Sequence, residues 1–169
     1  MVALLLAAGC ASDKQQRVCP RVAVLSEAGS LTRFAAGERH DILDISFQAQ
    51  IGDLPAECTY PDGNRRVVVQ LSPVFILDRG AANDDGKAAF IYFVSVVRTD
   101  EILSKQTFDL SFDFPVNRTR LAVQDGDPPI IVTIPLPYRD AEYEYEVLVG
   151  FQLTPDELSY NQRWQNLGR

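Results

Sequence analysis

Few residues of this 169-residue chain could support nucleophilic catalysis. The sequence contains one histidine, His40, between Arg39 and Asp41. A Ser-His-Asp site would need this histidine as its general base, yet no serine lies in the G-x-S-x-G turn that exposes a nucleophile. We therefore interpret His40 as a solvated loop residue and expect no hydrolase of this type.

Metal ligands are also scarce. Transition-metal sites usually take several His, Cys or Met side chains, and the chain has one His, one Met and three Cys. Calcium prefers six to eight oxygen ligands, and the candidates for it are Asp78, Asp84 and Asp85, which Asp125 and Asp127 could join. Their spacing differs from that of an EF-hand, and Asn-Asp-Asp-Gly is also typical of a hairpin turn. We therefore predict no metal and no cofactor, with calcium at this loop as the alternative.

Grouped carboxylates are the remaining candidates for acid–base chemistry. Asp109 and Asp113, and likewise Glu142, Glu144 and Glu146, alternate with apolar residues. Glycosidases use two carboxylates, but this alternation places the charges on the outward faces of strands, where they also discourage edge pairing. The sequence thus favours a protein that is not an enzyme, and a carboxylate-dependent hydrolase is the least favoured alternative.

The segment Leu4–Cys10 is a short apolar run that ends in small residues and a cysteine. It is too short to span a bilayer, which takes about 20 apolar residues, and is typical of an export signal. Its end, Ala7-Ala8-Gly9-Cys10, resembles the lipobox of bacterial lipoproteins. This resemblance implies that residues 1–9 are a signal peptide and that Cys10 carries a covalent lipid. Because no basic residue precedes the apolar run, we expect the true start codon to lie upstream of Met1.

The resemblance also implies a location. A lipoprotein of this kind is anchored in the bacterial cell envelope, here facing the periplasm, with residues 10–18 as a polar tether. Ala11, not Asp, follows the cysteine, which in enterobacterial-type sorting favours the outer membrane. The net charge of −7 argues against nucleic acid and against an anionic lipid surface as partners. The lipid would therefore be the contact with the membrane.

With Cys10 modified, Cys19 and Cys58 remain. Disulfides persist in exported proteins, so we predict a Cys19–Cys58 bond. It would close a loop of about 40 residues, for which the chain-entropy estimate is roughly 3–4 kcal/mol. The alternative is two unrelated buried thiols.

Alternation of apolar and polar residues organises most of the chain into strands. It is clearest in residues 41–51, 107–114 and 143–153, whereas residues 88–97 are apolar almost throughout, as in a central strand covered on both faces. No helix is long enough to connect parallel strands. We therefore expect residues 19–153 to form one antiparallel β-sandwich of seven or eight strands, Ig-like or fibronectin-like in outline.

Residues 154–169 are expected to form a short helix and tail. Thr154-Pro155-Asp156-Glu157 combines a capping threonine, a proline at the first helical position and a glutamate three residues after the cap. Tyr160, Arg163 and Trp164 follow, and these residue types are enriched at protein interfaces. We predict a docking segment here, the alternative being that the tail only caps the sandwich.

These features favour a lipid-anchored, non-enzymatic protein of the cell envelope, which binds another envelope protein as a subunit of a complex. The alternative is a periplasmic module that binds a small ligand, calcium or a glycan.

Overall fold

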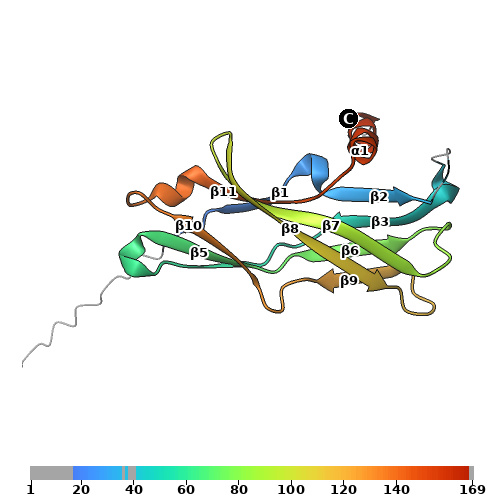
Figure 1. The fold of residues 1–169 in the computed structure, drawn as a ribbon, viewed down its shortest axis with the longest axis horizontal. Helices are drawn as coiled ribbons and strands as arrows, with labels where there is room; N and C mark the ends of the chain where they lie inside the picture. Colours follow the sequence, from blue (N-terminus) through green and yellow to red (C-terminus); the bar gives the residue numbers. More distant parts are fainter. Residues whose placement is uncertain (1–16, 36, 38–40, 168–169) are drawn as a thin grey trace, which may run out of the picture.

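The computed structural model describes residues 17–35, 37 and 41–167. Cys10, His40 and most of the expected tether lie outside the described residues. As predicted, the chain is mostly β-structure arranged in sandwich-like sheets, with one C-terminal helix (Figure 1). The strands are β1 (Arg21–Val24), β2 (Ser30–Phe34), β3 (Ile45–Ile51), β4 (Ala56–Thr59), β5 (Arg66–Leu71), β6 (Val74–Arg79), β7 (Lys87–Arg98), β8 (Glu101–Asp113), β9 (Arg120–Gln124), β10 (Ile130–Pro135) and β11 (Tyr145–Phe151). Four 3-10 turns, η1 (Ser26–Ala28), η2 (Ile42–Asp44), η3 (Asp62–Asn64) and η4 (Ala141–Glu144), and the helix α1 (Pro155–Leu167) complete the described chain.

The first sheet has the strand order β1-β11-β7-β8. β7 and β8 form a long antiparallel hairpin, and β11 pairs antiparallel with β7. β1 pairs with β11 in parallel, with Val22 opposite Val147. The expectation of an antiparallel sandwich therefore does not hold for this pair. A parallel pair needs a long connection, and here nearly the whole domain lies between the two strands.

The second layer consists of two sheets with the orders β2-β3-β6-β9 and β10-β5-β4. The chain passes directly from one of these sheets to the other three times, from β3 to β4, from β5 to β6 and from β9 to β10. Pro73 lies between β5 and β6, because a proline cannot donate to a strand ladder. The backbone N–H of Val74 donates to Asp53 O at 2.9 Å, so the stretches stay connected across the break. These interruptions explain why the described residues form eleven strands, where seven or eight were expected.

The core lies between the two layers. Its centre is a cluster of rings in which Phe75 lies 4.8 Å from Tyr92, 5.2 Å from Phe90 and 5.8 Å from Phe151, measured between ring centroids. β7 is covered on both faces only in its second half, since Phe93 is buried while Ile91 remains 40% exposed. The expectation that the whole of this strand is covered was therefore only partly correct.

Two residues before β11 differ from the expected pattern. Tyr143 was expected to face the core but lies in η4 and is 68% exposed. Glu142 was expected to point to solvent but is 1% exposed. The reason is that the extended strand begins only at Tyr145, so the alternation does not apply to the turn before it.

Candidate binding site

A groove of about 860 Å³ lies between α1 and the outer face of β2, β3 and β6, the elements in the right half of Figure 1. Its volume falls in the range of small-ligand sites. The described residues that line it are Ser30, Leu31, Thr32, Asp41, Ile42, Ile45, Gln48, Ala49, Gln50, Ile76, Asp78, Tyr160, Asn161 and Trp164. One wall is therefore helix, the floor is sheet, and η2 forms part of the rim.

The helical wall is held in place by its N-terminal cap and by a buried amide. Thr154 accepts a hydrogen bond from the backbone N–H of Glu157 at 3.3 Å, and the Thr154 N–H donates to the Glu157 carboxylate at 2.8 Å, which confirms the predicted helix start. Asn161 donates to the backbone oxygens of Glu27 at 3.2 Å and Ser30 at 2.8 Å. These contacts fix α1 beside β2.

The structure brings together two of the three residues predicted for partner binding. Tyr160 and Trp164 both line the groove, with ring centroids 6.0 Å apart. Tyr160 is half-buried against Phe34, whereas Trp164 remains 59% exposed. Arg163 lies over the Tyr160 ring at 5.9 Å but is not part of the lining.

Sequence reasoning did not identify the floor of the groove. Gln48 and Gln50 occupy the polar positions of the alternation in β3, so they lie on the outer face while Ala49 between them is buried. Gln48 donates an amide N–H to the hydroxyl of Thr32 on β2 at 3.2 Å. The alternation indicated which residues point outward, but not that a helix distant in sequence would enclose them.

The two carboxylates of the lining already have partners. Asp41 accepts a hydrogen bond from the backbone N–H of Ile42 at 2.6 Å as the cap of η2. Asp78 forms an ion pair with Arg120 at 3.5 Å. Asp78 therefore has a cationic partner, whereas the hydrogen bond from Ile42 leaves the negative charge of Asp41 in place.

The segment considered for calcium is organised as a turn. Asn83 is buried and donates to the backbone oxygen of Lys87 at 2.8 Å, while Asp85 accepts from the backbone N–H of Lys87 at 3.0 Å. Asp78 lies in β6 and Asp84 is exposed. Among the described residues, no three His, Cys, Asp or Glu side chains are grouped so that they could hold a metal ion.

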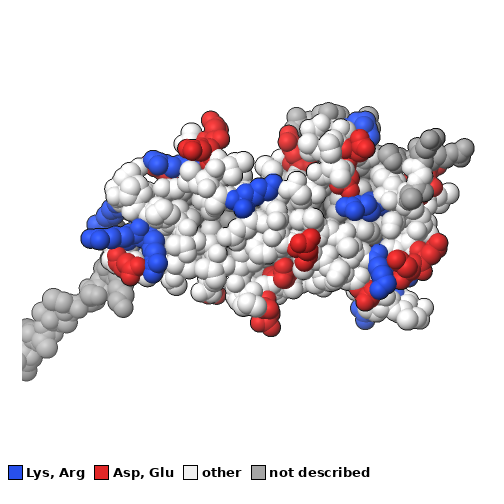
Figure 2. All heavy atoms as spheres, viewed as in Figure 1, with Lys and Arg blue, Asp and Glu red and all other residues white. Residues whose placement is uncertain are grey.

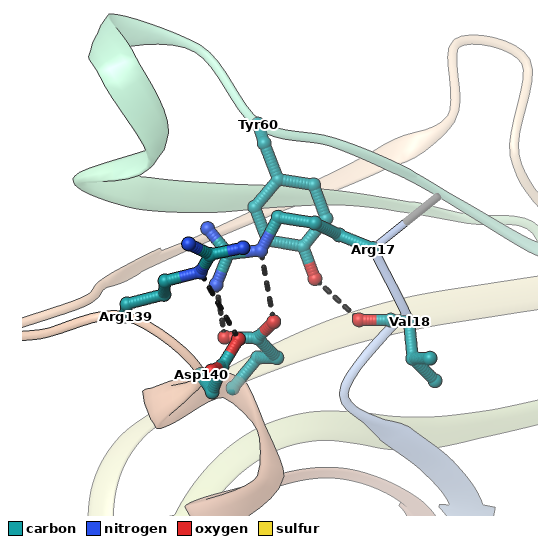
Figure 3. Close-up of polar contacts among 6 residues, drawn as sticks. Arg17, Val18, Tyr60, Arg139 and Asp140 are labelled. Atoms are coloured by element: carbon teal, nitrogen blue, oxygen red, sulfur yellow. Dashed lines mark hydrogen bonds and ion pairs between the residues drawn. The ribbon is translucent and has the colours of Figure 1, made fainter. Parts of the chain in front are cut away.

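A second polar cluster lies where the described chain begins (Figure 3). Arg17 donates from Nε to Glu142 Oε1 at 3.0 Å and from Nη2 to Glu142 Oε2, and its guanidinium lies 4.4 Å from the centre of the Tyr60 ring. The hydrogen bonds to Glu142 raise the pKa of Arg17 above its ordinary value. This bidentate pair joins the start of the chain to η4 near its end.

Two further contacts fix the same end of the domain. The Tyr60 hydroxyl donates to the backbone oxygen of Val18 (Figure 3). Burial, and after it the negative charge of Glu142, raises the pKa of Tyr60. The predicted disulfide between Cys19 and Cys58 is present, with Cα atoms 5.7 Å apart.

Charges of both signs are interspersed on the face shown in Figure 2. On the face in Figure 2, most Lys and Arg side chains lie beside Asp or Glu. Exposed ion pairs of this kind include Arg21–Glu146 and Arg98–Glu144.

Comparisons with protein-family models, with curated proteins and with solved structures found no match to this chain. Within the described residues, no helix has the length and apolar character needed to cross a membrane.

Proposed function

We propose that this chain is a lipid-anchored, non-enzymatic protein of the bacterial cell envelope that binds another envelope component through the groove beside α1. The lipid would be attached to Cys10, and the outer membrane is the proposed location, on its periplasmic side. The observation that carries this proposal is the separation of the two ends of the domain. The described chain before β1 starts at the end formed by η3 and η4, whereas α1, which forms one wall of the groove, lies in the opposite half (Figure 1).

The fixed start of the chain limits how the domain would sit on a membrane. Seven peptide units separate Cys10 from Arg17, so that a fully extended segment covers at most about 25 Å. Arg17 and Cys19 are tied to the domain by the Glu142 pair and by the disulfide. A lipid on Cys10 would hold this end near the bilayer and leave the groove facing away from it.

Metabolic labelling with a fatty acid, followed by membrane fractionation, tests the anchor. We expect the full-length chain to take up the label and to sediment with membranes, and the Cys10→Ser variant to lose both properties. A Cys10→Ser variant that stays membrane-bound, or a wild-type chain without label, would contradict the anchor.

Photo-crosslinking in cells tests the binding role. A photoreactive residue at Gln50 should form an adduct that the same residue at Gln70 does not form. Gln70 is a suitable control because it is also an exposed strand glutamine but lies outside the groove lining. Equal adducts at both positions, or none at either, would contradict a binding role for the groove.

A further inference from the structure

We propose that the groove between α1 and the β2-β3-β6 face binds an uncharged, extended saccharide chain. This inference rests on the proposed binding function and names the chemical class of the ligand. Three properties of the described lining support it: its aromatic wall, its amide and hydroxyl floor, and the absence of Lys and Arg side chains.

The aromatic wall offers apolar surface together with hydrogen-bonding groups. Trp164 leaves most of its ring accessible beside Tyr160, although a large aromatic side chain gains by removing its surface from water. The C–H groups on one face of a sugar ring can cover such a surface. The indole N–H can then donate to a sugar oxygen.

The floor presents donors and acceptors in a row. Gln48 and Gln50 lie two residues apart on one face of β3, which places them about 7 Å apart along the strand. Each amide group offers both N–H donors and a carbonyl acceptor, and a sugar hydroxyl can both donate and accept. Gln48 uses one N–H for Thr32, and its carbonyl oxygen can still accept from a ligand.

The charge of the described lining disfavours an anionic ligand. Asp41 and Asp78 are engaged by the Ile42 N–H and by Arg120, and the described lining contains no Lys or Arg. An anionic ligand would lose hydrating water on entering the groove, and the described lining has no cation that could compensate for this loss. Burying an unpaired charge is costly. A cationic ligand would have to displace Arg120 at Asp78 but could approach Asp41 directly, so a tetralysine titration is needed as a control.

The shape of the groove favours an extended ligand over a buried small molecule. Its floor crosses three neighbouring strands, β2, β3 and β6. A peptide that paired with the free edge of β2 would be the main competing occupant. However, α1 already lies beside that strand, held by Asn161 and by the Arg33–Glu157 ion pair at 2.8 Å.

The single tryptophan of the chain makes the test direct, since Trp164 is the only residue of its type and it lies in the groove. The full-length chain carrying Cys10→Ser is titrated with chitotetraose, cellotetraose and, as a charged control, tetralysine. We expect a saturable change in Trp164 emission with at least one of the two saccharides and none with tetralysine.

Two matched variants test whether the change in Trp164 emission comes from a saccharide bound in the groove. Gln50→Ala should weaken saccharide binding about five- to tenfold, as loss of one or two neutral hydrogen bonds does, while Gln70→Ala should leave it unchanged. Circular dichroism verifies that both variants are folded. No saturable change with either saccharide, equal affinities of Gln50→Ala and Gln70→Ala, or saturation by tetralysine alone would each overturn the proposal.

This titration is independent of the anchor. Because the Cys10→Ser chain cannot be lipidated at this position, saccharide binding is measured whether or not the natural chain is lipidated. Failure of the titration would thus remove the saccharide ligand but leave the labelling result intact, and failure of the labelling would leave the saccharide site intact.

Discussion

Removing one partner of the Arg17–Glu142 ion pair should destabilise the domain far more than removing one partner of a surface ion pair. The side chains of Arg17 and Glu142 are 14% and 2% exposed. Arg17→Met keeps an unbranched apolar side chain but leaves the Glu142 carboxylate buried without its cation. Removing one partner of a buried pair costs about 3–5 kcal/mol. We expect about 3 kcal/mol, the lower end of this range, because Arg17 is still partly accessible to water.

Urea unfolding measures this loss. With a slope near 2 kcal/mol per molar urea, a loss of about 3 kcal/mol lowers the midpoint by about 1.5 M. The matched control is Lys87→Met, because the Lys87–Asp113 pair at 3.0 Å has side chains that are 66% and 78% exposed. Exposed pairs contribute little, so this variant should unfold close to the wild-type midpoint.

A double-mutant cycle separates the pair from other effects. When both partners are replaced in Arg17→Met/Glu142→Met, no unpaired charge remains, and the loss of stability should be smaller than the sum of the single losses by at least about 2 kcal/mol. The reasoning would be refuted if the single losses added, or if Arg17→Met unfolded at the same midpoint as Lys87→Met.

Three further predictions concern other parts of the fold. Replacing Cys19 and Cys58 with serine should lower the free energy of unfolding by about 3–4 kcal/mol, since the bond joins residues 39 apart in sequence; an unchanged urea midpoint would contradict this. Burial, followed by the hydrogen bond that Tyr92 donates to Asp125, raises the pKa of Tyr92 well above its ordinary value of 10.0. Above about pH 10 the folded state therefore retains a proton that the unfolded state releases. The contribution of Tyr92 to the free energy of unfolding should be constant below about pH 10 and fall above it. Tyr92→Phe should reduce this alkaline slope in unfolding measurements at pH 8 to 11, and an unchanged slope would contradict the assignment. Thr154→Ala removes the cap of α1 and should cost about 1 kcal/mol, with the Trp164 emission spectrum reporting any release of the helix.

The sequence predicted the features that depend on local pattern. Alternation in β3 and in the second half of β8 placed Phe47 and Phe112 toward the core and Gln48 and Asp113 outward, as observed. The cap at Thr154 is a local hydrogen-bond motif and could be predicted from four residues. The pairing of Cys19 with Cys58 required only that two cysteines remain once Cys10 is assigned to lipid.

Only the tertiary structure decided the features that depend on distant contacts. Glu142 was assigned to an outward strand face because its neighbours alternate, but the turn η4 and the distant Arg17 make it a buried partner. The groove likewise needs α1, which Asn161 fixes beside β2 across 131 positions of sequence. Residue pattern along the chain determines which side chains face outward, because it follows the local backbone geometry. Which outward residues become enclosed depends on how elements far apart in the chain pack, and this pattern does not contain that information.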